Sequence, residues 1–262
     1  MQADKPVDRF GLIVIGDEIL SGKRRDAHLG HSIEALGRRG LVLSWCRYLG
    51  DEAELLTRNL METMASGDVV FSFGGIGATP DDLTRQCAAT ARGVRLLRHA
   101  GAAAELEARF GAAAYPNRIL MADLPESAEL IPNPVNRVPG FSLGDHHFLP
   151  GFPQMAWPMM AWVLDTRYPH LRPEQARAEA ALWVLDSSES ALLDVMLELH
   201  RRPGLKLFSL PHLGSDGRRH IELGVKGEPV SVAAAMAWLQ TTLTELGVAW
   251  AAELPEDRTR TD

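Results

Sequence analysis

Gly74-Gly75-Ile76-Gly77-Ala78-Thr79-Pro80-Asp81-Asp82 is the most informative stretch of the sequence, because this glycine-rich turn directly follows a predicted strand, Asp68–Phe73. The glycines permit positive φ values and allow a ligand to approach the backbone closely. Free amides of such a turn, followed by a helix N-terminus, attract phosphate. We therefore expect a phosphate-binding turn at the end of a buried strand.

The helix after this turn is predicted to begin near Thr79 and Pro80. Thr79 is expected as N-cap, Pro80 as the first helical residue and Asp82 as the third, where a carboxylate can cap the turn. The alternative to a ligand-binding role is that Asp82 only caps the helix. The glycines alone do not decide between these two roles. The turn is not a Walker loop, because the lysine and Ser/Thr ending is absent, and it lacks the GxGxxG spacing of dinucleotide sites.

Outward from this turn, apolar runs alternate with segments of helical periodicity. Buried strands are predicted over Phe10–Ile15, Leu41–Leu49 and Asp68–Phe73, with helices over Asp26–Arg39 and Glu52–Ala65 between them. Both crossovers are long enough for parallel pairing. Ligands of parallel sheets bind at the carboxyl ends of the strands. The turns after Ile15, Leu49 and Phe73 are therefore expected to converge on one site.

The next part of the chain is less regular. A helix is expected around Leu106–Phe110, and the segment from 115 to 149 shows only short strand-like pieces at Glu129–Ile131 and His147–Leu149. Asp145-His146-His147 is expected to form a turn. Pro153–Tyr168 has the spacing of a helix that closes the first domain.

Two prolines break the pattern around Pro169–Glu174, which predicts a boundary there. We expect one domain over residues 1–170, a small α+β domain over 171–252 and a disordered tail over 253–262. The small domain is predicted as βαββα, with elements at Ala181–Leu185, Ser190–His200, Lys206–Leu210, Ile221–Val225 and Val230–Leu246.

Composition excludes several classes of protein. The net charge of -7 argues against a general nucleic-acid or membrane surface role. No apolar run approaches the roughly 20 residues that a membrane-spanning helix needs. Cys46 and Cys87 form no CxxC pair. The expected compartment is the cytoplasm.

Several segments together resemble the competence/damage-inducible protein A (CinA) family. Gly16–Gly22 is similar to its GTELLLG segment, and Gly50-Asp51 is similar to its V-G-D turn. Gly74–Thr84 is similar to T-GGLGPT-x-DDLT. Asn117, Pro139-Gly140-Phe141 and Leu149–Pro153 resemble N…APGF…LPGPP in the same order. The region Ala181–Leu246 resembles the family's second domain, and 262 residues leave no room for the C-terminal deamidase domain of full-length members.

This resemblance implies an α/β, three-layer molybdopterin-binding fold with a mostly parallel sheet, shared with the MoaB and Mog proteins. It implies a phosphorylated ligand with a pterin or nucleotide part, and a pyrophosphatase acting on ADP-ribose or FAD-like dinucleotides with Mg²⁺ or another divalent cation. Asp51 and Asp82 match the family's catalytic and metal-holding aspartates. The ligand-binding positions implied are Gly16, Asp17, Glu18, Gly74, Gly75, Gly77, Thr79, Asp81, Asn117, Pro150 and Gly151. A homo-oligomer, a dimer or a trimer, is expected.

Five residues depart from the family pattern at the expected site. Asp17 stands in place of threonine, Asp26 and His28 in place of asparagines, and Ala78 and Phe152 in place of prolines. These changes leave open two alternatives to a pyrophosphatase. One is a transferase or carrier of molybdenum cofactor biosynthesis, and the other is a binding module without catalysis.

Other polar residues have simpler explanations. His28 and His31 lie three apart on a predicted helix, and a solvated or capping pair is favoured over a metal site. Arg24-Arg25 could meet a ligand phosphate, although a solvated pair in a loop is the commoner case. The acidic residues Asp17, Glu18, Asp51, Asp81 and Asp82 are more carboxylates than an anion-binding loop needs, which favours a divalent cation.

Overall fold

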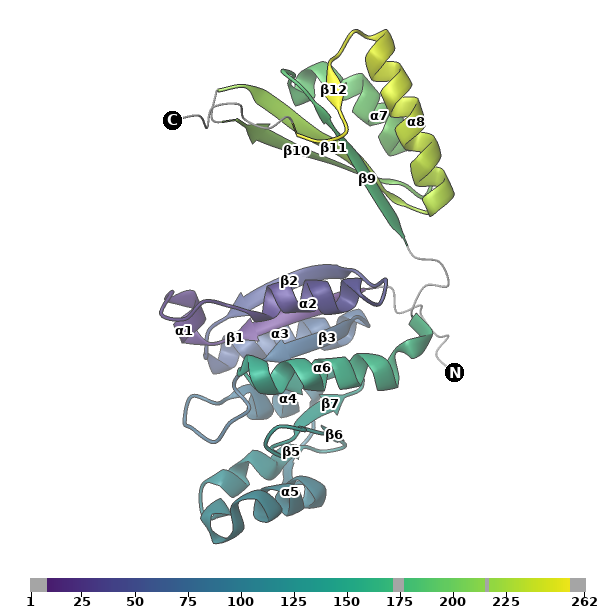
Figure 1. Cartoon of the computed structure of the whole chain (residues 1–262). Helices are drawn as coiled ribbons and strands as arrows, with labels where there is room; N and C mark the ends of the chain where they lie inside the picture. Colours follow the sequence, from purple (N-terminus) through teal and green to yellow (C-terminus); the bar gives the residue numbers. More distant parts are fainter. Residues whose placement is uncertain (1–8, 172–176, 215–216, 255–262) are drawn as a thin grey trace. The chain divides into compact units, whose positions relative to one another are not determined.

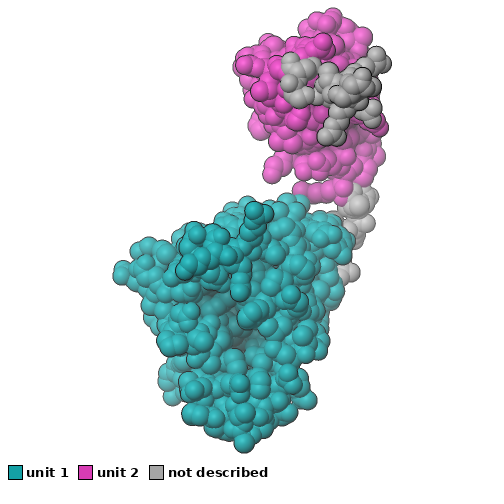
Figure 2. All heavy atoms as spheres, turned by 60° about the vertical axis from the view of Figure 1, so that its left-hand side comes forward, with its two compact units in different colours: residues 1–172 teal, residues 173–262 magenta. Residues whose placement is uncertain are grey.

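The computed structural model describes residues 9–171, 177–214 and 217–254. The chain divides into two compact units, residues 1–172 and 173–262, shown in teal and magenta in Figure 2. The tail predicted over 253–262 falls almost entirely outside the described residues. No helix of the described ranges is both long enough and apolar enough to cross a bilayer.

The first unit is built on a six-stranded sheet in the order β2-β1-β3-β8-β7-β6 (Figure 1). Pairing is parallel between β2, β1, β3 and β8, and antiparallel from β8 through β7 to β6. The strands are β1 (Phe10–Ile15), β2 (Leu43–Leu49), β3 (Val69–Phe73), β6 (Glu129–Ile131), β7 (Gly140–Leu143) and β8 (His146–Leu149). The predicted parallel arrangement of the first three strands is confirmed.

Helices cover both faces of this sheet and give three layers. The helices are α1 (Asp17–Leu20), α2 (His28–Gly37), α3 (Ala53–Ser66), α4 (Thr84–Arg92), α5 (Ala100–Phe110) and α6 (Pro153–Arg167). Alternate strand residues face opposite layers. Leu12 and Phe71 pack with α2 and α6, whereas Ile13 and Val70 pack with α3, α4 and α5. The predicted three-layer α/β fold is confirmed.

Short elements fill the segment between α4 and α6. A separate two-stranded sheet consists of β4 (Leu96–Arg98) and β5 (Asp123–Pro125). Between them, α5 is followed by 3-10 helices at Gly111–Ala114 and Arg118–Ala122. A further 3-10 helix, Pro169–Leu171, follows α6.

The second unit is an antiparallel sheet in the order β10-β11-β9-β12 with two helices. Its elements are β9 (Ala178–Val184), a 3-10 turn (Glu189–Leu192), α7 (Leu193–Arg201), β10 (Lys206–Leu213), β11 (Arg219–Gly227), α8 (Pro229–Glu245) and β12 (Trp250–Ala251). Its core draws only on residues of this unit, among them Leu182, Leu223 and Leu239. The α+β class is confirmed, and β12 is an addition to the predicted βαββα order.

Two sequence-based expectations for local structure are wrong. The helix after the glycine turn begins at Thr84 and not near Thr79. His146 and His147 are not part of a turn, because they are buried in β8 and only Asp145 lies in the turn before it. The Nε2 atom of each histidine contacts a hydroxyl distant in sequence, with Ser72 Oγ 2.9 Å from His146 Nε2 and Tyr168 Oη 2.7 Å from His147 Nε2.

Candidate functional site

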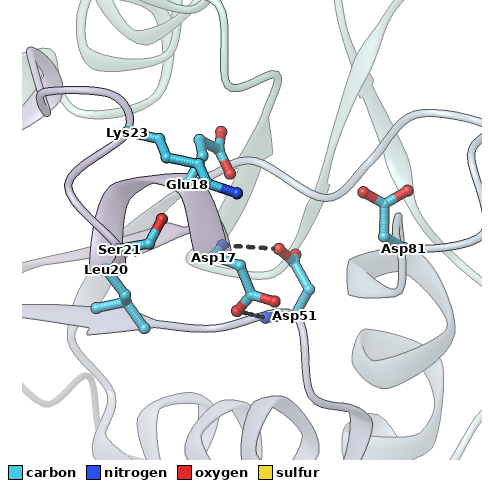
Figure 3. A pocket seen from close by; sticks show the side chains of 7 residues that line it. All are labelled: Asp17, Glu18, Leu20, Ser21, Lys23, Asp51 and Asp81. Atoms are coloured by element: carbon cyan, nitrogen blue, oxygen red, sulfur yellow. Dashed lines mark hydrogen bonds between the residues drawn. The ribbon is translucent and has the colours of Figure 1, made fainter.

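The carboxyl ends of the parallel strands are joined by backbone hydrogen bonds. Gly16 N donates to Leu49 O at 3.0 Å, and Gly74 N donates to Leu149 O at 3.0 Å. These bonds bring the turns after β1, β2 and β3 together with the end of β8. A pocket of about 670 Å³ lies at this edge, lined by Asp17, Glu18, Leu20, Ser21, Lys23, Asp51 and Asp81 (Figure 3). That volume lies within the range of about 300–1,000 Å³ that small-molecule sites occupy.

Asp17 and Asp51 hold the turns after β1 and β2 together by a reciprocal pair of hydrogen bonds. Asp17 N donates to Asp51 Oδ2 at 3.0 Å, and Asp51 N donates to Asp17 Oδ1 at 3.2 Å (Figure 3). Gly50 is required here, because a Cβ at this position would lie 2.6 Å from Asp17 Oδ1. The two carboxylates are thereby fixed side by side at the pocket.

Burial in this acidic pocket raises the pKa of the Asp51 carboxyl. Burial is the largest cause, and the negative charges of Asp17, Glu18 and Asp81 add to it, while the hydrogen bond from Asp17 N works in the opposite direction. Like charges that share a site disfavour each other's ionised form, and a bound cation relieves the repulsion. The electrostatics therefore suit a positively charged group beside Asp51.

Two carbonyls of the glycine turn are anchored by the first residue of α4. Thr84 Oγ1 donates to Gly74 O at 3.1 Å, and Thr84 N donates to Gly75 O at 3.0 Å. Within the described chain, no residue accepts a hydrogen bond from the backbone N–H groups of residues 75–78. Unpaired amides at successive turn positions form a concave site for an anion.

Asp82 braces the turn internally and does not line the pocket. Its Oδ2 accepts from Thr79 N at 2.9 Å and from Thr79 Oγ1 at 2.5 Å. Gly77 leaves room for this carboxylate, because a Cβ there would lie 2.4 Å from Asp82 Oδ2. The expected roles of Thr79 as N-cap and Pro80 as first helical residue are wrong, since Asp82 closes a tight turn ahead of α4.

The residues fit a metal ion only of a particular kind. Among the residues that the structure describes, no group of three or more His, Cys, Asp and Glu is placed to hold a metal ion. Mg²⁺, however, commonly takes one or two carboxylates, keeps several waters and shares phosphate oxygens with the substrate. Asp51 and Asp81 in the pocket suit such an ion, which would bind together with a phosphorylated ligand.

Comparison with known proteins agrees with this fold. The family model for a "Probable molybdopterin binding domain" matches residues 11–172. The chain belongs to this molybdopterin-binding domain family. It is 36% identical over 149 residues to a CinA-like protein of Anaeromyxobacter sp. (strain K), covering 54% of this chain and 36% of that one. It is 33% identical over 224 residues to a CinA-like protein of Gemmatimonas aurantiaca, covering 79% of this chain and 50% of that one.

A solved structure supports the same relationship. The protein CinA of Thermoplasma acidophilum, described as having unknown function, matches with a TM-score of 0.57 and 26% identity. The match covers 62% of this chain and 98% of that one. The chain spans half or less of the length of the two CinA-like relatives named above.

Two of the departures from the CinA-like pattern have structural roles beside the pocket. Asp26 caps the start of α2, accepting from His28 N at 2.8 Å and Leu29 N at 3.0 Å, and it also accepts from Tyr48 Oη at 2.8 Å. His28 is buried, stacks on Phe73 with ring centroids 4.3 Å apart, and its Nε2 lies 3.1 Å from Gly151 O. The expectation of a solvated or capping histidine is therefore wrong for His28.

The remaining predicted ligand positions of the CinA-like pattern are spread around this edge. Gly151 lies against the glycine turn, because a Cβ on it would be 3.5 Å from Gly74 Cα. Pro150 precedes it at the end of β8, and Phe152 is exposed before α6. Asn117 is exposed ahead of the 3-10 helix Arg118–Ala122 and is not among the residues that line the pocket.

Three features of the site were not predicted from the sequence. Lys23 lines the pocket, whereas the sequence offered the neighbouring Arg24-Arg25 as the basic residues that could meet a ligand phosphate. Thr84 anchors two carbonyls of the glycine turn. Arg85 is buried below the same turn. Lys23 follows a glycine turn closely enough to have been found, but a buried arginine inside a helix gives no such signal.

Proposed function

We propose that the first unit binds a phosphorylated nucleotide- or pterin-like ligand at the glycine turn and the acidic pocket beside it. One observation carries the proposal. The unpaired amides of residues 75–78 and the carboxylates of Asp17, Glu18, Asp51 and Asp81 occur at the same edge of the sheet, at the carboxyl ends of the parallel strands. Amides suit phosphate oxygens, and carboxylates suit a cation that neutralises them.

The reaction that fits this arrangement best is metal-dependent hydrolysis of a phosphoanhydride bond, with an ADP-ribose or FAD-like dinucleotide as substrate. Mg²⁺ would supply charge neutralisation on the phosphates and polarise them for attack by water. Asp51 would hold this ion together with Asp81, since both side chains line the pocket. The amides of the glycine turn would hold non-bridging oxygens and stabilise the charge that develops on them.

In this proposal Asp81 takes the metal-holding position that the family resemblance implies for Asp82. The backbone N–H and the hydroxyl of Thr79 both donate to Asp82 Oδ2. That oxygen is therefore occupied by hydrogen bonds within the turn. Asp17 would orient Asp51 through their reciprocal hydrogen bonds. Lys23 is the basic side chain that lines the pocket, and it would meet a non-bridging oxygen of the pyrophosphate.

A second candidate function is binding of molybdopterin or its adenylated form, as in molybdenum cofactor biosynthesis. The family model, whose description names molybdopterin, favours it. The same amides and carboxylates would serve, because both ligands carry phosphate. In an adenylyl transfer, the molybdopterin phosphate would attack the α-phosphate of ATP, and the products would be adenylated molybdopterin and pyrophosphate.

One experiment separates these functions. The protein is incubated with Mg²⁺ and, in separate reactions, with ADP-ribose, with FAD, and with molybdopterin plus ATP, and products are separated by chromatography. Hydrolysis of ADP-ribose adds water across the phosphoanhydride bond and yields AMP and ribose 5-phosphate. Formation of adenylated molybdopterin and pyrophosphate from molybdopterin and ATP supports the second function. Calorimetric binding without turnover of any of the three identifies a binding module, and an absence of binding to all three contradicts the proposal.

A further inference from the structure

Arg85 is a buried cation directly beneath the glycine turn. It is the second residue of α4, and only 4% of its surface is exposed. Its guanidinium donates to three backbone carbonyls. Nη2 donates to Gly77 O at 2.7 Å, and Nη1 donates to Asp123 O at 3.0 Å and to Leu120 O. The side chain therefore ties the turn to the segment that follows Asn117.

The contact with Gly77 fixes more than one atom. In a planar trans peptide, the C=O of one residue and the N–H of the next point in opposite directions. Because Gly77 O points at Arg85, the N–H of Ala78 points away from it. Thr84 acts in the same way on Gly74 O and Gly75 O, which directs the N–H groups of Gly75 and Ile76 away from the start of α4.

We propose that Arg85 is a positioning residue, which orients the Ala78 amide of the glycine turn for phosphate and links that turn to the Arg118–Ala122 segment. The ligand part of this inference rests on the proposed function. The orienting part concerns the protein without ligand. Arg85 makes no hydrogen bond to any of the described residues that line the pocket. Its effect on the site is therefore transmitted through the backbone of Gly77.

The chemistry of the side chain explains why an arginine occupies this position. Burial lowers the pKa of Arg85, and the negative charges of Asp123 and Asp82 oppose that effect. Arginine remains protonated under such conditions, and its planar fork presents several donors in fixed directions. A lysine in the same place is a single point charge on a flexible stem and cannot bind three carbonyls with the same geometry.

The test uses the full chain with Arg85→Lys and Arg85→Met, and with Arg92→Met as a matched control. Arg92 lies at the exposed end of the same helix and has no role in the turn. Two quantities are measured well below each variant's melting temperature. One is the order parameter of the Ala78 backbone amide, from ¹⁵N relaxation without ligand. The other is the calorimetric affinity for ADP-ribose with Mg²⁺.

We expect an order parameter of about 0.85 for the Ala78 amide in the wild type and in Arg92→Met, which is typical of rigid backbone. In Arg85→Lys we expect a value below about 0.6, which is typical of flexible backbone. Affinity for ADP-ribose should fall at least about tenfold in Arg85→Lys and stay unchanged in the control. If Arg85→Met does not fold, Arg85→Lys decides.

The positioning role is overturned if a folded Arg85→Lys keeps both the wild-type order of Ala78 and the wild-type affinity, even when its melting temperature is lower. A purely structural role would give that result. If the wild type binds no ADP-ribose, ADP-ribose is excluded as the ligand of the proposed function, and the order parameter of Ala78 still decides the role of Arg85.

Discussion

Asp17 and Asp51 each accept a hydrogen bond from the other's backbone N–H, at 3.0 Å to Asp51 Oδ2 and 3.2 Å to Asp17 Oδ1. Two like charges are thus held side by side by the main chain, where repulsion alone would separate them. Burial and this arrangement together raise the pKa of Asp51. These electrostatics support the cation of the proposed function, and the predictions on metal and ligand binding below depend on that proposal.

Asp51→Asn should raise the stability of the metal-free protein at neutral pH. A carboxyl whose pKa is raised on folding contributes stability that is present below its ordinary pKa and is lost as pH rises through the raised value. Asparagine keeps the shape and does not ionise. We expect a higher melting temperature at pH 7. The gain in the free energy of unfolding should be less than about 1 kcal/mol, because the carboxyl is partly exposed. The difference should vanish near pH 3, below the ordinary pKa of about 3.9. A lower melting temperature at pH 7 would contradict the repulsion.

Asp17→Asn should shift the pH dependence of ligand binding. Its side-chain oxygen can still accept from Asp51 N, but the charge that helps to raise the pKa of Asp51 is gone. Binding of ADP-ribose with Mg²⁺ should be lost as pH falls through the pKa of Asp51, and the midpoint should lie lower in this variant. Calorimetry across the acidic range measures it. Glu54→Gln, on the exposed first turn of α3, is the control and should leave the midpoint in place.

Asp81→Asn and Asp82→Asn should have opposite signatures. Asp81 lines the pocket, so its loss should raise the Mg²⁺ concentration for half-maximal binding by at least about tenfold, without lowering the melting temperature. Asp82 braces Thr79, so its loss should cost about 1 kcal/mol of stability and leave the Mg²⁺ midpoint in place. Metal titrations and thermal melts on both variants give the answer. The reverse pattern would return the metal-holding role to Asp82.

Gly75 of the glycine turn should not tolerate substitution, whereas Gly151, which lies against this turn, should. Gly75 has a φ of +67°, and a Cβ there would lie 2.2 Å from Thr84 Oγ1. Gly75→Ala should therefore cost on the order of 2–4 kcal/mol, from backbone strain and overpacking. Gly151→Ala places its Cβ at an ordinary 3.5 Å from Gly74 Cα and should melt like the wild type. Equal melting temperatures for the two variants would contradict the described turn. Gly75 substitutions, then, are unsuitable for testing ligand binding alone.

Strand and helix order followed from sequence because the relevant signals are local. Phe10–Ile15 is a continuous apolar run and Val69–Phe73 is apolar except for Ser72, as expected for strands covered on both faces. The start of α4 was missed because Thr79, Pro80 and Asp82 are residues that suit a helix cap and a tight turn equally well. Whether these residues form a cap or a tight turn depends on Gly77. Because Gly77 has no side chain, the Asp82 carboxylate can pack against the turn.

The buried polar residues were the other source of error, since their partners are distant in sequence. His28 is stabilised by Phe73 and Gly151, and His147 by Ser142 and Tyr168. Histidines next to an aspartate or at a helix start look solvated when only the neighbouring residues are considered. The carboxylate pocket itself could be predicted, because its members follow strand ends that a parallel sheet must bring together.

The central claim is that a cation held by the pocket carboxylates binds ADP-ribose phosphates at the glycine turn. The most direct measurement is Mg²⁺-dependent hydrolysis of ADP-ribose by the wild type, Asp51→Asn and the control Glu54→Gln, with folding checked by melting temperature. We expect the wild type and Glu54→Gln to hydrolyse ADP-ribose only when Mg²⁺ is present. We expect Asp51→Asn, while folded, to lose a factor on the order of 100 in rate, corresponding to roughly 3 kcal/mol of transition-state stabilisation. An Asp51→Asn protein with the wild-type rate and the wild-type Mg²⁺ dependence would contradict it.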